Sequence, residues 1–195
     1  MFQRQSYIKC FFDEKATDWD QRNHYNPALV TEVLDKLNIL PNSRILDVGC
    51  GTGVLFPQLL GLNPKFIHGL DLSESMVRIA EEKYTDPRIQ VFTEDFYQFS
   101  GTGYDFVVMY NAYPHFWDRD KLAFQMRKCL RPNGRMLILH GAGREKINRC
   151  HLRYSVEISK TLSACQEEIR YFLPYFCIDG MEDTPARYFF SGTAK

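Results

Sequence analysis

Residues 45–53 constrain the fold of this chain more than any other segment. Their sequence is ILDVGCGTG, in which the apolar pattern of a buried strand leads into three glycines at alternate positions. The next residues, Val54–Leu60, have the pattern of a helix. Glycines between a buried strand and a helix let the backbone turn sharply and let a ligand approach the main chain. The segment therefore predicts an open α/β sheet with a ligand site at the carboxyl ends of its strands.

Strand-like and helix-like segments alternate along the whole chain, which is typical of βαβ units around a parallel sheet. The expected strands are Arg44–Val48, Phe66–Leu70, Arg88–Phe92, Tyr104–Tyr110, Arg135–His140, Tyr175–Asp179 and Ala186–Gly192. The expected helices are Ala28–Leu37, Val54–Leu60, Ser73–Tyr84 with Ser73 as its N-cap, Lys121–Leu130 and Leu162–Tyr171. We therefore expect a Rossmann-like, doubly wound, mostly parallel seven-stranded sheet with helices on both faces. Its last two strands are expected to form an antiparallel hairpin around Met181–Pro185, and Arg131–Gly134 has the composition of a turn.

The length of the chain, 195 residues, suits a single domain over residues 1–195 with one sizeable core. Residues 1–40 precede the first expected strand and contain the aromatic residues Phe11, Phe12, Trp19 and Tyr25. We expect this leading segment to pack on the sheet or to cover its ligand edge. A polar stretch follows the fifth expected strand at about residues 141–160 and is expected to be part helix and part loop.

The charge balance weakens a role in nucleic-acid binding. Lys and Arg total 24 and Asp and Glu total 24, so the formal net charge is zero with neutral histidines, and bulk attraction for a polyanion is lacking. No apolar run approaches the roughly 20 residues that span a membrane, and the first residues lack the apolar core of a signal peptide. The six cysteines form no C-x-x-C pair and match no zinc pattern. We expect a soluble, cytoplasmic monomer or homodimer without a metal, a membrane partner or a nucleic-acid partner.

The glycine loop is compatible with two classes of ligand. A dinucleotide site favours G-x-G-x-x-G, but the position of the third glycine, counted from Gly49, holds Val54. Asp47 would repel a pyrophosphate and would attract a cationic amine. The loop therefore favours a ligand with an amino group over a dinucleotide.

At this point the sequence resembles the class I S-adenosylmethionine-dependent methyltransferases, in the small-molecule branch of type 11, UbiE-like enzymes. Asp71 stands 20 residues after Gly51, where the family has an acidic residue for the ribose hydroxyls. The stretch from Asp71 to Met76 resembles the family's D-x-S-x-x-M. The segment from Phe12 to Asp20 resembles the family's F-D-x-x-A-x-x-W-D opening. The resemblance implies that S-adenosylmethionine is the cofactor and that it is bound by Trp19, Asp47, Gly49, Cys50, Gly51, Thr52, Gly53, Asp71, Leu72, Ser73, Met76, Glu94, Asp95, Phe96, Asn111 and Ala112.

The resemblance further implies methyl transfer, and the sequence favours a small-molecule acceptor. Amino-methylating nucleic-acid enzymes of this class carry [DNS]-P-P-[YF] after the fourth strand, whereas this chain has Asn111 followed by Ala112 and Tyr113. His115 is the predicted catalytic base or substrate-orienting group, because histidine titrates near neutral pH. A structural or cofactor-facing histidine is the alternative at this position.

Other residues are candidates for the surroundings of the methyl group. His140 and His151 are further histidines that could face the pocket, and Trp19, Tyr25 and Tyr113 could place an aromatic face near the sulfonium. Inserts after the fifth strand often form a substrate wall in this family, so the resemblance implies that residues 141–160 form such a wall. The basic residues of this insert are either contacts for an acidic substrate or a solvated helix face: Arg144, Lys146, Arg149 and Arg153.

Two other functions remain open at this point. One is a methyltransferase-like protein that binds S-adenosylmethionine or serves as a scaffold without catalysis. The other is a nicotinamide-dependent oxidoreductase, which the glycine spacing disfavours. The intact loop argues against the first alternative, although cofactor binding by itself does not prove turnover.

Overall fold

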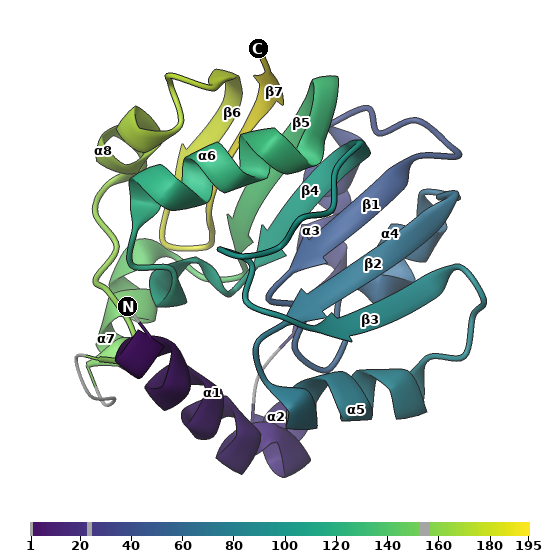
Figure 1. Cartoon of the computed structure of the whole chain (residues 1–195). Helices are drawn as coiled ribbons and strands as arrows, with labels where there is room; N and C mark the ends of the chain where they lie inside the picture. Colours follow the sequence, from purple (N-terminus) through teal and green to yellow (C-terminus); the bar gives the residue numbers. More distant parts are fainter. Residues whose placement is uncertain (1, 23–24, 153–156) are drawn as a thin grey trace.

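The computed structural model describes residues 2–22, 25–152 and 157–195, and it is built around one seven-stranded sheet (Figure 1). The strand order is β3-β2-β1-β4-β5-β7-β6. The strands are β1 (Arg44–Val48), β2 (Phe66–Asp71), β3 (Ile89–Thr93), β4 (Tyr104–Tyr110), β5 (Leu130–His140), β6 (Phe176–Asp183) and β7 (Tyr188–Ala194).

The direction of the strands confirms the predicted fold class. The first five strands are parallel to their neighbours, while β7 runs antiparallel to both β5 and β6. The order reverses between β1 and β4, so the polypeptide leaves β1 and β4 toward opposite sides of the sheet. In open α/β sheets this switch point is where ligands bind. The glycine loop follows β1 directly and therefore lies at the switch point.

Helices cover both faces of the sheet. One face carries α3 (Pro27–Asp35), α4 (Phe56–Gly61) and α5 (Glu74–Lys83), and Val33, Phe56 and Ala80 are buried in its core. The other face carries α6 (Arg119–Cys129), α8 (Cys165–Glu168) and the 3₁₀ turn η3 (Ile169–Tyr171). Fully buried residues such as Met126 and Phe172 fill that second core. Apolar layers on both faces explain why the central strands are almost continuously apolar.

The N-terminal helices lie across the carboxyl ends of the parallel strands (Figure 1). They are α1 (Phe2–Lys15), the 3₁₀ turn η1 (Ala16–Asp18) and α2 (Trp19–Arg22). Helix α7 (Arg144–His151) follows β5 and lies beside the N-terminal end of α1. None of the helices formed by the described residues is long and apolar enough to cross a membrane.

Two local predictions differ from the structure. The segment Arg131–Gly134 lies within β5, yet it bulges out, because Leu130 pairs with Tyr104 and Arg135 already pairs with Phe106. Its residue Asn133 has a positive φ of 61°, so the turn composition indicated a real departure from regular pairing.

The predicted helix Leu162–Tyr171 is wrong in its first turn. The N–H of Leu162 donates to Asn148 Oδ1 at 2.8 Å and that of Ser163 donates to Glu168 Oε1 at 3.1 Å. Because these two N–H groups already donate to side-chain oxygens, they do not need helical hydrogen bonds, and the helix starts only at Cys165.

Candidate functional site

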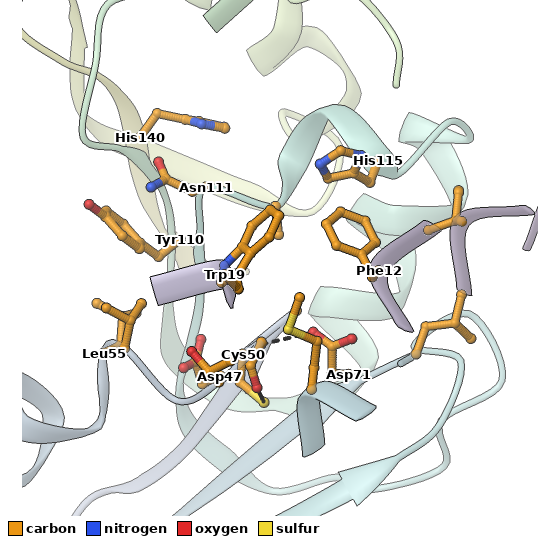
Figure 2. Close-up of a pocket in the computed structure, with 18 of the residues that line it drawn as sticks. Phe12, Trp19, Asp47, Cys50, Leu55, Asp71, Tyr110, Asn111, His115 and His140 are labelled. Carbon is orange, nitrogen blue, oxygen red and sulfur yellow. Dashed lines mark hydrogen bonds between the residues drawn. The ribbon is translucent and has the colours of Figure 1, made fainter. Parts of the chain in front are cut away.

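A cavity of about 750 Å³ opens at the carboxyl ends of β1, β2, β4 and β5. The glycine loop and Asp71 form its floor in the view of Figure 2, while His115 and His140 lie on the other side. Residues of α1 and α2, among them Phe12 and Trp19, reach into the space between them. The cavity is therefore enclosed by the sheet edge, the N-terminal helices and α7.

The glycine loop is fixed by its two neighbours. The N–H of Gly51 donates to Asp71 Oδ2 at 2.8 Å, which ties the loop to the end of β2. Gly49 has a φ of +69°, and a Cβ there would lie 2.6 Å from the Cβ of Ala112. Only glycine therefore fits at position 49, where the loop passes the segment after β4.

Asp47, the last acidic residue of β1, is buried without a partner. Its side chain is 1% exposed, and neither carboxylate oxygen has a hydrogen-bond partner in the described part of the chain. Burial raises the pKa of this carboxyl to about 8, and the nearby Asp71 carboxylate adds to the rise. Buried polar atoms almost always have partners, so this orphaned carboxylate on the cavity surface points to a ligand that carries a cation or donors.

The Asp71 carboxylate is oriented by two backbone hydrogen bonds. Its Oδ1 accepts from the N–H of Ser73 at 2.9 Å, and its Oδ2 accepts from Gly51. Burial raises the pKa of Asp71, and the hydrogen bonds from Ser73 and Gly51 oppose that rise. A carboxylate fixed by two backbone donors keeps lone pairs free for a vicinal diol.

The side of the cavity near β3 is lined by apolar residues and one carboxylate. Met76 is 1% exposed and Phe96 is 3% exposed, and both line the cavity. Asp95 accepts from the N–H of Tyr97 at 3.0 Å, and the Gln5 amide of α1 lies 3.2 Å and 3.3 Å from its two oxygens. The carboxylate is therefore shared between its own turn and the N-terminal helix.

Two aspartates of the N-terminal segment fasten it to the site. Asp13 Oδ1 accepts from Ser73 Oγ at 2.6 Å and from the N–H of Ser75 at 3.1 Å, at the N-terminus of α5. Asp20 accepts from Thr52 Oγ1 at 2.5 Å and from Lys83 Nζ at 2.6 Å. Both aspartates belong to the opening motif seen in the sequence, so this motif joins the cover to the glycine loop.

His115 presents a proton acceptor to the cavity. Its Nδ1 lies 2.8 Å from the carbonyl oxygen of Ile158, which can only accept, so Nδ1 carries the proton and Nε2 carries a lone pair. The pKa of His115 is lowered to about 4, chiefly by burial, with His151 and Arg119 acting in the same direction and the hydrogen bond to Ile158 opposing them. The ring packs edge-on against Phe12, with 4.9 Å between the centroids. His115 is therefore a neutral base at neutral pH.

A second histidine lies at the end of β5. His140 is 2% exposed, lines the cavity, and its Nε2 has no hydrogen-bond partner among the described residues. Burial lowers its pKa to about 3, and His151, His115 and Arg119 act in the same direction. Asn111, after β4, has a positive φ of 54° and accepts from the N–H of Gly141 at 3.1 Å. The ends of β4 and β5 thus present neutral polar groups.

The structure brings most of the predicted cofactor residues together around this cavity. The residues that line it are Trp19, Asp47, Gly49, Cys50, Gly51, Thr52, Asp71, Leu72, Met76, Glu94, Asp95, Phe96, Asn111 and Ala112. Gly53 and Ser73 stand behind this lining. A Cβ at Gly53 would meet Phe56 at 2.6 Å, and the Ser73 hydroxyl accepts from the N–H of Met76 as the predicted N-cap of α5.

Several predictions about the acceptor side need correction or remain open. Tyr113 was expected near the methyl group, but it is fully buried away from the cavity, where its hydroxyl donates to Glu168 Oε2 at 2.6 Å. Lys146, Tyr25 and His151 line the cavity, whereas Arg144 pairs with Asp183 at 3.0 Å and Arg149 is an exposed residue outside the lining. Arg153 lies outside the described residues.

Two contributors were missed in the sequence. Gln5 lines the cavity and reaches Asp95, and Lys83 lines it while binding Asp20 and the carbonyl oxygen of Thr52. Neither belongs to a motif, and both act across more than 30 residues of chain, so no local signal could have found them. No group of three His, Cys, Asp or Glu residues within the described ranges is placed to hold a metal ion.

Known proteins share both the sequence pattern and the fold. The family model described as "Methyltransferase domain" matches residues 45–134. Phosphoethanolamine N-methyltransferase 2 of Caenorhabditis elegans is 33% identical over 109 residues, which cover 53% of this chain and 25% of that protein. The O-methyltransferase cnsE of Penicillium expansum is 30% identical over 138 residues, which cover 68% of this chain and 50% of that protein. The chain thus spans half or less of the length of these two relatives.

A solved structure shows how far the fold agrees. A protein solved in complex with the Haloferax volcanii Trm112 methyltransferase activator, and described there as "the putative methyltransferase", superposes with a TM-score of 0.80. It is 17% identical, and the superposition covers 94% of this chain and 97% of that one. The matched glycine loop, the curated relatives and the fold agree with the resemblance seen in the sequence. Over residues 45–134 the chain matches the methyltransferase family model, and the findings together support a class I S-adenosylmethionine-dependent methyltransferase.

Proposed function

We propose that this protein transfers a methyl group from S-adenosylmethionine to a small-molecule acceptor. The observation that carries the proposal is the buried Asp47 carboxylate, whose two oxygens face the cavity without a partner. The amino group of the cofactor's methionine part is a cation with several donors, and it would pair with this carboxylate. Asp47 therefore fits the methionine end of S-adenosylmethionine.

The neighbouring residues fit the remainder of the cofactor in order. Asp71, oriented by Gly51 and Ser73, would accept from the ribose hydroxyls. Leu72, Met76 and Phe96 would lie against the adenine, and the Asp95 carboxylate would accept from the adenine amino group. When bound, the cofactor supplies a strongly electrophilic methyl group on its sulfonium.

The protein's own residues then have three tasks. The enclosed cavity would exclude water, and its walls would align an acceptor atom in line with the methyl group. The aromatic rings of Phe12 and Trp19 lie 5.4 Å apart between the loop and His115, so they could stabilise a cation by their faces. His115, neutral and with its Nε2 lone pair available, would accept a proton from the acceptor atom.

A small molecule is the better acceptor for this site than a nucleic acid. The formal net charge is zero, and the cavity is covered by α1, α2 and α7. Both relatives named above are methyltransferases whose names give different methylated atoms, nitrogen in one and oxygen in the other.

The proposal is tested by radiolabelled methyl transfer to a small-molecule extract, beside calorimetry with S-adenosylhomocysteine. Label incorporated into small molecules by the wild type, and lost in the Asp71→Ala variant, supports the proposal. Binding of S-adenosylhomocysteine without any incorporation would instead identify a binding protein that has lost catalysis. Thermal stabilisation by NAD or NADP alone would identify an oxidoreductase.

A further inference from the structure

The wall of the cavity opposite the glycine loop differs in charge from the remainder of the lining. We call it the acceptor wall, and it consists of Tyr110, Asn111, His115, His140, Ile147 and His151. The acidic residues that line the cavity lie in α2, β1, β2 and the turn after β3, and none belongs to the acceptor wall: Asp20, Asp47, Asp71, Glu94 and Asp95. In the described part of the chain the acceptor wall is therefore polar without a negative charge.

Positive charge is also scarce at the acceptor wall. Among the cationic residues that line the cavity, Lys83 is bound to Asp20 and Arg22 is paired with Asp18. Lys146, next to Ile147 on α7, is exposed. The pKa values of His115 and His140 are lowered to about 4 and about 3, so both rings are neutral near pH 7.

His140 is a buried group without a partner of its own. His140 lines the cavity, and its ring nitrogen Nε2 is buried and makes no hydrogen bond to the described residues. The groups around it are the His115 turn, His151 of α7, the Arg119 guanidinium and the Tyr188 ring, whose centroid lies 6.0 Å away. A buried nitrogen without a hydrogen bond costs free energy, and a ligand that hydrogen-bonds to it would remove that cost.

The two histidines constrain the chemistry of that ligand. A carboxylate or phosphate has no proton for the His115 lone pair, and the buried cation near the two histidines, Arg119, is already paired with Glu168 at 3.4 Å. An ammonium ion has donors, but it would sit in a buried wall without a carboxylate, near the Arg119 guanidinium that lowers the pKa of both histidines. An uncharged hydroxyl group can donate to His115 at no such cost.

We propose that the methyl acceptor is an uncharged hydroxyl compound, and that His140 binds a second polar group of it while His115 takes the hydroxyl proton. The proposal rests on the methyltransferase function proposed above. In the reaction a bond forms between the hydroxyl oxygen and the methyl carbon, and the bond between that carbon and the sulfonium sulfur breaks. The electron pair of the broken bond stays on sulfur, which becomes a neutral thioether, and the proton moves to His115 Nε2 and then to solvent. The product is a methyl ether.

The bond type of the labelled product tests the substrate class. The wild-type protein is incubated with radiolabelled S-adenosylmethionine and pooled small-molecule extracts of bacterial and fungal cells. Label in alkali-stable, non-basic products that resist performic acid oxidation, and that hot hydriodic acid releases as volatile methyl iodide, is expected for methyl ethers. Label that hydriodic acid does not release is a C-methyl group, which overturns the proposal but leaves the methyltransferase function intact. Alkali-labile label indicates esters, label retained on cation exchange indicates methylamines, and label shifted by oxidation indicates thioethers. Each of these three overturns the proposal but leaves the methyltransferase function intact, whereas no incorporation contradicts both.

A dilution series of the same extract tests His140. His140→Phe should raise the half-saturating extract concentration roughly tenfold, because one buried polar contact is lost, while the plateau rate stays close to that of the wild type. His140→Asn keeps a polar group, so its half-saturating extract concentration should lie between those of the wild type and of His140→Phe. His68→Phe is the matched control, since His68 stacks on Phe66 at 4.4 Å outside the cavity lining, and it should change neither value. Unchanged half-saturation in both His140 variants, with normal binding of S-adenosylhomocysteine, would overturn the assignment of His140.

Discussion

The backbone N–H of Gly51 donates a 2.8 Å hydrogen bond to Asp71 Oδ2, which joins the glycine loop after β1 to the end of β2. The two residues stand 20 positions apart in the sequence, and this bond explains why a fixed spacing between them matters. The loop and the carboxylate cannot be placed independently. The geometry of the proposed cofactor site is therefore set at the switch point of the sheet.

Replacing Asp71 tests this relationship. Asp71→Ala should weaken binding of S-adenosylhomocysteine by roughly 30- to 100-fold, because the ribose acceptor is lost and the Gly51 and Ser73 N–H groups lose their partner. Asp71→Asn keeps one acceptor oxygen, so its affinity for S-adenosylhomocysteine should fall less than that of Asp71→Ala. Calorimetry on both variants provides the measurement, and equal affinity for wild type and Asp71→Ala would place the ribose elsewhere.

Asp47 should make the ligand-free protein less stable as the pH rises. Its pKa is raised from 3.8 to about 8 in the folded state, so the folded protein holds a proton that the unfolded chain has released. The bound proton contributes fully to the free energy of unfolding at pH values below the pKa of Asp47 in the unfolded chain. Between pH about 4 and about 8 the free energy of unfolding should therefore fall, by up to ~1.4 kcal/mol per pH unit. Chemical denaturation at several pH values should show this slope in the wild type and not in Asp47→Asn. If the free energy of unfolding depended on pH in the same way in both proteins, the burial of an uncompensated carboxyl at Asp47 would be contradicted.

His115 should act as a base whose pKa lies below the ordinary value of histidine. His115→Gln should reduce the rate of label incorporation by about 10²- to 10⁴-fold and leave the affinity for S-adenosylhomocysteine unchanged. Because the pKa of His115 is lowered to about 4, its base form is complete at neutral pH. At saturating cofactor, the wild-type rate should therefore show no inflection near pH ~6.5, the ordinary histidine value. An inflection there that disappears in His115→Gln would show an ordinary pKa instead.

The N-terminal cover should loosen when Asp13 is removed. Asp13→Ala breaks the bonds to Ser73 and Ser75 at the start of α5, so the backbone amides of α1 should exchange with solvent roughly 5- to 30-fold faster. Asp18→Ala is the matched control, because Asp18 pairs with Arg22 of the adjoining helix α2. Hydrogen exchange followed by mass spectrometry reports both variants. Equal acceleration in the two variants would mean that Asp13 does not fasten α1 to α5.

A buried ion pair behind His115 should dominate local stability. Arg119 and Glu168 have side chains that are 1% and 4% exposed, and Arg119 donates to the carbonyl oxygens of Tyr113 and Phe116 on either side of His115. Glu168→Ala should lower the free energy of unfolding by about 3–5 kcal/mol, because it leaves a buried guanidinium uncompensated. The exposed neighbour Glu167, replaced in the same way, should change it by less than ~0.5 kcal/mol. Similar losses for both residues would contradict the role of the pair.

The predictable parts of this molecule are those that local sequence determines. The strand bounds of Arg44–Val48 and Tyr104–Tyr110 and the Ser73 cap agree with the structure, because apolar runs and capping residues act over a few positions. The antiparallel hairpin of β6 and β7 was also predicted, but β6 extends to Asp183, so the first residues of the range Met181–Pro185, where the connection was expected, belong to the strand.

The remainder depends on contacts between distant segments. Tyr113 was placed near the methyl group because it follows β4, but the 3₁₀ turn at Tyr113–His115 directs it to Glu168, 55 positions away. The contact of Gln5 with Asp95 and the orphaned Nε2 of His140 appear only when the sheet edge is assembled. The charge of Asp47 beside the glycine loop predicted a ligand with an amino group, but only the folded protein shows that neither carboxylate oxygen has a hydrogen-bond partner among the described residues.

Calorimetric titration of S-adenosylhomocysteine at pH ~7, in buffers of different ionisation enthalpy, tests the central claim most directly. The resting Asp47 carboxyl is protonated at this pH, and an amino group that pairs with it must displace the proton. Pairing of Asp47 with the amino group predicts saturable binding with release of close to one proton from the wild type and none from Asp47→Asn. Absence of binding to the folded wild-type protein at millimolar ligand, or binding without proton release, would contradict it.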